Sequence, residues 1–158
     1  MSPCVSRVRR VLPAFVSLAL IWFASPASAR LGGDYASVSD DSAKLKGQLV
    51  STAMLNYDRH DITTSSGSVI HEYLSRAGKV FAVTWQAPLP PDLHQLFGDY
   101  FEPFRSAAAA QSRPGGHHQL SIAQSDFVVQ ASGHLRAFQG KAYVPSLVPP
   151  GVTVADLQ

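Results

Sequence analysis

The chain has 158 residues, with 13 basic and 11 acidic side chains and a formal charge of +2 at pH 7. Its first 29 residues hold three of the 13 basic residues and no acid, which leaves 10 basic and 11 acidic residues, a charge of −1, for residues 30–158. A domain with such balanced charge lacks the basic surface that binds nucleic acid or anionic lipid, so neither is an expected partner.

Residues 1–29 have the pattern of a secretory signal peptide. Arg7, Arg9 and Arg10 form a basic head, residues 11–24 (VLPAFVSLALIWFA) an apolar run, and residues 25–29 (SPASA) a small-residue end. This pattern predicts export and cleavage after residue 29. The apolar run is shorter than the roughly 20 residues that span a bilayer, so we expect no stable membrane span after cleavage. The expected location is the periplasm or the outside of the cell.

The only cysteine, Cys4, belongs to this leader. The mature chain would therefore hold no cysteine, which excludes disulfides, thiol catalysis and cysteine-based zinc sites. The remaining residues, 30–158, are expected to form a single domain.

Residues 39–46 predict a short helix, since Ser39 can cap its start and Gly47 can end it. Strand patterns follow at residues 48–55, 56–64, 68–75 and 79–86. In the last of these, Phe81, Val83 and Trp85 alternate with smaller side chains, so we expect all three to face the core.

Residues 92–110 predict the main helix. Apolar side chains recur there at helical spacing: Leu93, Leu96, Phe97, Tyr100, Phe101 and Phe104. A stripe of this kind is typical of a buried helix face. Gly98 and Pro103 interrupt the segment, and Pro103 is expected to kink or divide the helix.

Beyond a loop at residues 112–118, further strands are expected and a helical turn should follow Gly151. The predicted strands are 120–124, 126–132, 134–138 and 141–147, with breaks at residues 124–125, 132–133 and 139–140. The expected fold is α+β, an antiparallel sheet of about six to seven strands with the helix 92–110 on one face and a short N-terminal helix. One main helix cannot cover such a sheet, so the other face should be a solvated surface, a ligand cleft or a docking site.

Two short motifs in the stretch from Val69 to Trp85 are incomplete. His71-Glu72 begins the zinc-protease motif H-E-x-x-H, but Ser75 stands where the second histidine is needed, and a strand would send His71 and Glu72 to opposite faces. Gly78-Lys79 lacks the first glycine and the final hydroxyl residue of a phosphate-binding loop. Gly78 is better explained as part of a turn.

No complete catalytic or metal-binding motif is present, so we assign no catalytic residue, no metal and no cofactor. His117 and His118 could bind a metal weakly, and a convergence of His60, His71 and His134 is conceivable because they lie on separate predicted strands. For a cleft on the uncovered face, the candidate ligand-binding residues are His71, Tyr73, His134 and Arg136.

The chain resembles the bacterial family called domain of unknown function 2844. The resemblance rests on four blocks: LGGDYASV at 31–38, HEYLSRAGKVFAVTWQAP at 71–88, PDLHQLFGDYF at 91–101 and GHLRAFQGKAYVPSLVPPGV at 133–152. It implies a small exported protein of Gram-negative bacteria. The family brings no activity and no assigned residues with it.

Two functions follow as hypotheses. The sequence favours a non-catalytic periplasmic or secreted domain that binds an envelope protein partner through its uncovered sheet face or a free edge. The alternative is a small-ligand-binding protein or an enzyme with a cleft on that face.

Overall fold

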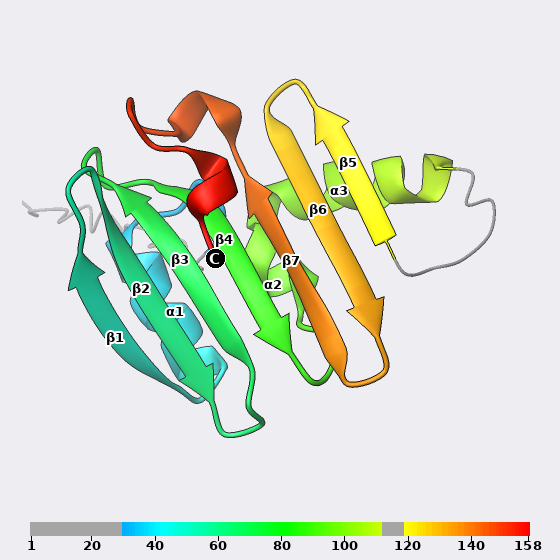
Figure 1. Cartoon of the computed structure of the whole chain (residues 1–158), viewed down its shortest axis with the longest axis horizontal. Coiled ribbons are helices and arrows are strands. Elements are labelled where there is room, and N and C mark those ends of the chain that lie inside the picture. Colours follow the sequence, from blue (N-terminus) through cyan, green and yellow to red (C-terminus); the bar gives the residue numbers. More distant parts are fainter. Residues whose placement is uncertain (1–29, 112–118) are drawn as a thin grey trace, which may run out of the picture.

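The computed structural model describes residues 30–111 and 119–158. The expected leader, His117 and His118 lie outside these residues. The described chain is built on one seven-stranded antiparallel sheet with helices on one face (Figure 1). The strands are β1 Gly47–Ala53, β2 Tyr57–Thr64, β3 Val69–Ser75, β4 Val80–Ala87, β5 Gln119–Gln124, β6 Phe127–His134 and β7 Ala137–Tyr143. The helices are α1 Tyr35–Lys44, α2 Leu93–Phe97 and α3 Phe101–Ala110, with 3-10 turns η1 Gly98–Tyr100, η2 Pro145–Leu147 and η3 Val154–Asp156.

The strand order is β1-β2-β3-β4-β7-β6-β5. The first four strands follow one another as hairpins, after which the helical segment carries the chain behind the sheet to its far edge. The chain then returns through β5 and β6 to β7, which pairs with β4. The α+β fold predicted from the sequence is confirmed.

The main helix is divided at Gly98, not at Pro103. Gly98 has a φ of +53°, and a Cβ placed on it would lie 1.8 Å from Cδ of Arg30, so only glycine fits there. Pro103 instead lies in the first turn of α3, where a missing backbone N–H costs little. The expectation that Pro103 breaks the helix was therefore wrong.

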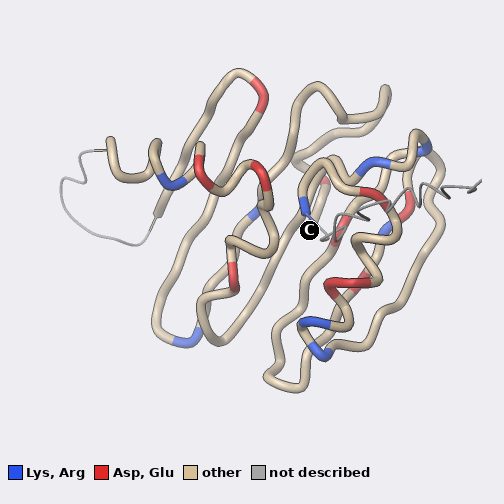
Figure 2. Tube along the Cα trace, turned by 180° about the vertical axis from the view of Figure 1, so that it is seen from behind, with Lys and Arg blue, Asp and Glu red and all other residues tan. Residues whose placement is uncertain are grey.

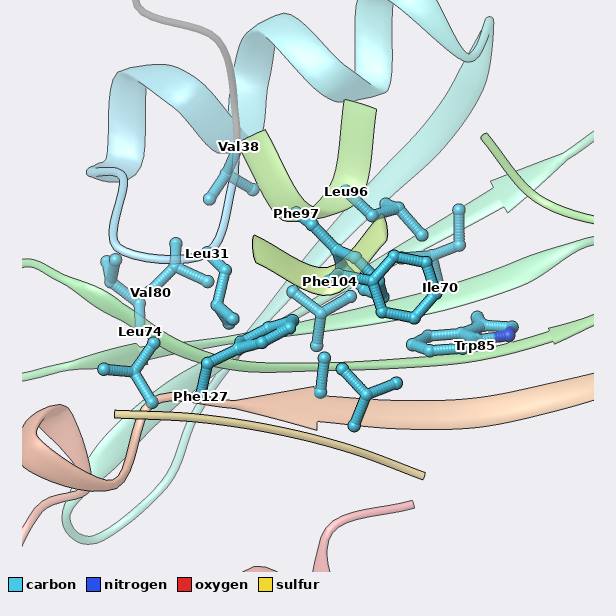
Figure 3. Packing of buried hydrophobic residues seen from close by; sticks show 14 of the residues in the cluster. Leu31, Val38, Ile70, Leu74, Val80, Trp85, Leu96, Phe97, Phe104 and Phe127 are labelled. Carbon is cyan, nitrogen blue, oxygen red and sulfur yellow. The ribbon is translucent and has the colours of Figure 1, made fainter. Parts of the chain in front are cut away.

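The aromatic stripe of α2 and α3 packs on the sheet and forms the main core (Figure 3). The ring of Phe97 lies 5.8 Å from that of Trp85, 5.0 Å from that of Phe104 and 5.5 Å from that of Phe127, measured between centroids. Aromatic pairs at these separations add to the stability that burial itself supplies. The predicted core role of the stripe is confirmed.

The N-terminal helix begins earlier than expected. Asp34 accepts a hydrogen bond from the backbone N–H of Ser37 at 3.1 Å and caps α1, so the helix starts at Tyr35 and Ser39 lies inside it. α1 covers the β1–β3 half of the same sheet face that α2 and α3 cover on the other half (Figure 1).

The C-terminal segment, residues 145–158, crosses the opposite face of the sheet (Figure 1). It forms a second, smaller core with β3, β4 and β7, in which Leu157 packs near Tyr73 and Phe81. Phe81 therefore does not face the helices, as its alternation with Val83 and Trp85 had predicted. The pairing of β3 with β4 shifts register between Tyr73 and Leu74, and this irregularity turns Phe81 to the same side as Ala82.

The last hairpin also differs from the sequence prediction. The breaks expected at residues 132–133 and 139–140 are absent, because the first pair lies within β6 and the second within β7. The chain turns instead at Leu135 and Arg136, where Arg136 adopts a φ of +64°. Of the helices in the described ranges, none is long and apolar enough to cross a membrane.

Candidate functional site

An open polar groove of about 890 Å³ lies on the sheet face that the helices leave uncovered. Its floor runs across β3, β4, β7, β6 and β5, and the end of the C-terminal segment, at Leu157 and Gln158, forms part of one wall. Gln111, at the end of α3, reaches the outer side of β5 and donates to the carbonyl of Ser121 at 2.6 Å. The groove is therefore the part of the second face that the C-terminal segment does not occupy.

The strand register places the floor side chains in two rows across the sheet. One row contains Ser121, Gln130, Lys141, Thr84 and His71. The other row contains Gln119, Ser132, Gln139 and Gln86. These positions alternate with core residues along each strand, so their side chains point to the same face. The polar groove is defined by these two rows.

The lining is polar but nearly uncharged. It consists mainly of amide and hydroxyl side chains, with Lys141 as its one lysine and no arginine, aspartate or glutamate among the residues described. Lys141 donates from Nζ to the carbonyl of Val154 at 3.3 Å. Gln86, Gln130 and Gln139 are exposed, and their side chains make no hydrogen bond to any part of the chain that the structure describes.

His71 is held by a neighbouring acid at the edge of the groove. Its Nδ1 lies 2.6 Å from Oδ1 of Asp61 on β2. Arg59 binds the same carboxylate, with Nη2 donating to Oδ2 at 3.0 Å and Nε 2.9 Å from Oδ1. Asp61 is thereby neutralised, and the second ring nitrogen of His71 remains the one available for contacts in the groove.

The four predicted ligand-binding residues do not all come together. His71 lines the groove. Tyr73 lies beside it but is buried beneath the C-terminal segment, where its hydroxyl donates to the carbonyl of Gln158 at 2.6 Å. His134 lies at the end of β6 and Arg136 in the turn that follows, and neither lines the groove.

A pair of buried carboxyl groups lies on the opposite, helix-covered side of the sheet. Asp41 of α1 is 0% exposed and Glu72 of β3 is 1% exposed. Asp41 Oδ1 accepts a hydrogen bond from Nε2 of Gln95 at 2.7 Å; apart from the contact between the two carboxyl groups, Oδ2 of Asp41 and the oxygens of Glu72 have no hydrogen-bond partner in the described chain. Figure 2, a view from this side, shows acidic residues along α1 with basic residues beyond them.

The environment favours a proton between these two carboxyl groups. Burial raises the pKa of Asp41 from 3.8 to about 6, although the hydrogen bond from Gln95 lowers it. Burial, followed by the charge of Asp41, raises the pKa of Glu72 well above its usual value. We assign the proton to Glu72, which has no other partner, so that it donates to Asp41. The side chains of His71 and Glu72 thus point to opposite faces of the sheet, as the strand pattern of this segment predicted.

The three histidines considered for a metal site do not converge. His60 lies on the covered side, 3% exposed, with Nδ1 2.8 Å from Oγ of Ser51 and its ring against that of Tyr35. Burial lowers the pKa of His60, with Asp58 and Asp61 opposing the shift. His71 faces the groove, on the other side of the sheet. Within residues 30–111 and 119–158, no three His, Cys, Asp or Glu side chains could hold a metal ion.

The amide side chains of the groove are the residues that sequence reasoning missed. Gln86, Gln130 and Gln139 occupy exposed positions in strands that are central to the sheet. Polar residues at alternate strand positions signal an open sheet face, but the sequence did not show that β7 would pair with β4 and bring them side by side.

The fold and groove define a class of protein: an α+β domain whose antiparallel sheet has one helix-covered face and one partly open polar face. A family model described as "Protein of unknown function (DUF2844)" matches residues 27–157, and the chain belongs to this family. Neither a curated protein nor a solved structure matches the chain.

Proposed function

We propose that this protein is an exported, non-catalytic binding domain, periplasmic or secreted, which holds its ligand or envelope partner in the polar groove. The observation that carries the proposal is the groove itself, about 890 Å³ in volume and floored by side chains from neighbouring strands. Binding sites are commonly concave, largely preformed and furnished with a few polar groups that orient the ligand.

The floor is suited to binding because its backbone is rigid and its exposed amide side chains have no hydrogen-bond partner in the described chain. β4, β7 and β6 are each paired on both sides, so their backbone is fixed. The amides of Gln86, Gln130 and Gln139 point from this rigid backbone without a hydrogen-bond partner in the described residues. Exposed amides of this kind can exchange water for ligand at low cost.

The export part of the proposal rests on the sequence of residues 1–29, with its basic head, apolar run and small-residue end. An exported domain meets the proteins and polymers of the cell envelope, so the partner should be found there.

Photocrosslinking in cells tests the proposed function. A photoreactive amino acid would replace Gln130 or Gln139 in the full chain, expressed in a Gram-negative host, and Leu55 would serve as the control because it is 91% exposed outside the groove. We expect adducts in the envelope fraction from both groove positions and none from Leu55. If exported, folded protein formed no adduct at either groove position, the proposed function would be refuted.

One observation favours an enzyme as the second candidate. The contact of 2.6 Å between Asp61 and His71 resembles the way a carboxylate orients a catalytic base. Among the described residues, however, no hydroxyl group makes a hydrogen bond with the second ring nitrogen of His71. If the protein is an enzyme, ligand recovered from it should be chemically altered and His71→Gln should abolish the alteration. A binding domain should return its ligand intact, as mass spectrometry can establish.

A further inference from the structure

We infer that the ligand of the polar groove is a neutral glycan chain that lies across the strands and is held by the two rows of amide and hydroxyl side chains. This inference rests on the proposed function and names the ligand class for the same groove.

The lining selects against charged and apolar ligands. A strongly anionic polymer such as nucleic acid needs several cations, whereas among the described residues of the groove Lys141 is the one lysine and there is no arginine. A cationic ligand would need acidic side chains, but no aspartate or glutamate lines the groove among the described residues, and Asp61, the partner of the lining residue His71, is already bound by Arg59. A lipid would need a continuous apolar surface, whereas the apolar lining residues, Trp85, Leu120, Ala131 and Leu157, are interrupted by the two rows of polar side chains.

Amides and hydroxyls each offer both donors and acceptors. A ligand that matches them must also offer donors and acceptors in similar number, at short intervals and without charge. The hydroxyl groups of sugars have this property, because each one both donates and accepts. Gln86, Gln130 and Gln139, which lack partners within the described chain, supply the matching groups on the protein.

The geometry favours a glycan over an extended peptide. A peptide added to a sheet gains most of its hydrogen bonds by pairing with a free strand edge. The floor strands β3, β4, β7 and β6 are paired on both sides and present only side chains, and at the edge strand β5 the carbonyl of Ser121 is already bound by Gln111. A chain that crosses the strands meets a new polar side chain about every 4.8 Å, the spacing of neighbouring strands. This step is close to the length of one sugar unit in an extended glycan.

The lining also predicts how binding should depend on chain length. Trp85 contributes to the lining, but its ring packs on Phe97 in the core and the residue is only 4% exposed, so it offers no stacking platform. Affinity must then come from many hydrogen bonds, each contributing about 1 kcal/mol. Affinity should therefore rise from a disaccharide to a hexasaccharide.

Isothermal calorimetry on protein purified from the envelope of cells that express the full chain tests the inference. The probes are cellohexaose, the β-1,4-linked N-acetylglucosamine hexamer and the disaccharide of each, with an uncharged hexapeptide of glycine, serine and asparagine as the competing class. We expect saturable binding of at least one hexasaccharide, weaker binding of its disaccharide and no binding of the peptide.

Matched variants locate the binding. Gln130→Leu and Gln139→Leu each remove one amide without changing charge and should weaken hexasaccharide binding about 3- to 10-fold. Gln48→Leu is the control, because Gln48 lies on β1 outside the groove lining and its loss should leave the affinity unchanged.

Failure would take distinct forms. If neither hexasaccharide bound saturably, or if Gln48→Leu weakened binding as much as the groove variants, the glycan inference would be overturned. If the peptide bound and lost affinity in Gln130→Leu, the ligand class would be wrong while the proposed function stood. The absence of photocrosslinked adducts in cells is the separate result that refutes the proposed function itself.

Discussion

Replacing Glu72 by glutamine should make the stability of the fold less sensitive to pH. Glu72 and Asp41 are both fully buried beneath α1, and both have pKa values raised by burial. A glutamine has nearly the shape of a protonated glutamate and can still donate a hydrogen bond to Asp41, but it cannot ionise. The substitution therefore keeps the contact and removes one titrating group.

The size of the effect follows from proton linkage. A carboxyl whose pKa is higher in the folded protein than in the unfolded chain stabilises the fold fully at low pH, and this stability is lost as the pH rises to the folded-state pKa. For Asp41 the interval runs from 3.8 to about 6. At about 1.36 kcal/mol per pKa unit, this interval corresponds to about 3 kcal/mol. The raised pKa of Glu72 acts with the same sign and extends the loss to higher pH.

In the Glu72→Gln variant, Asp41 stays buried, so its pKa stays raised and the loss of about 3 kcal/mol that Asp41 causes remains. The variant should therefore lose about 3 kcal/mol in free energy of unfolding as the pH rises from 3.8 to about 6, whereas the original protein should lose more, and go on losing stability towards pH 8, as Glu72 ionises. Urea denaturation, followed by the fluorescence of Trp85 across this range, measures the difference. Glu102→Gln is the control, since Glu102 pairs with Arg105 on the surface and its loss should change stability by about 0.5 kcal/mol or less.

The linkage reasoning would be refuted if the difference between Glu72→Gln and the original protein stayed constant with pH. It would also be refuted if the variant lost stability faster than the original protein as the pH rose, because the raised pKa of Glu72 predicts the opposite.

Three further predictions concern the sheet, the C-terminal segment and the leader. Gly140→Ala should cost about 2 kcal/mol or more in urea denaturation, because its Cβ would lie 2.4 Å from Cζ2 of Trp85; an unchanged midpoint would contradict this packing. Leu157→Ala should cost about 2 kcal/mol or more and accelerate hydrogen–deuterium exchange in residues 145–158, whereas unchanged protection would mean that Leu157 does not hold the segment. Ala29→Phe should block processing, so mass spectrometry should find the uncleaved chain in the variant and a chain that begins at Arg30 in the original; equal processing of both would contradict the predicted leader.

Much of the fold could be predicted because its signals are local. The helical spacing of apolar residues between Leu93 and Phe104 identified the helix, and the alternation of polar and apolar residues identified the sheet. The errors arose where tertiary structure decided the outcome. The irregular pairing beside Tyr73 places the side chain of Phe81 on the sheet face opposite the helices. Arg136 adopts a positive φ, which residues other than glycine rarely do.

Less of the candidate site could be predicted, because the site depends on which strands become neighbours. His71 was identified as a cleft residue and lines the groove. Gln86 and Gln139 are 53 positions apart in the chain, and only the pairing of β4 with β7 places them opposite each other. The sequence likewise indicated that Glu72 points away from His71, but it did not indicate that Glu72 would meet Asp41 of a separate helix.

The most direct test of the groove is a nuclear magnetic resonance titration of the purified, ¹⁵N-labelled protein with the β-1,4-linked N-acetylglucosamine hexamer and with cellohexaose. The proposed function and its glycan ligand predict that backbone amides of β4, β6 and β7 shift with ligand concentration, together with the side-chain amides of Gln86, Gln130 and Gln139. Shifts confined to α1, α3 or β1, or no shifts with either hexasaccharide, would contradict the assignment of the groove as a glycan-binding site.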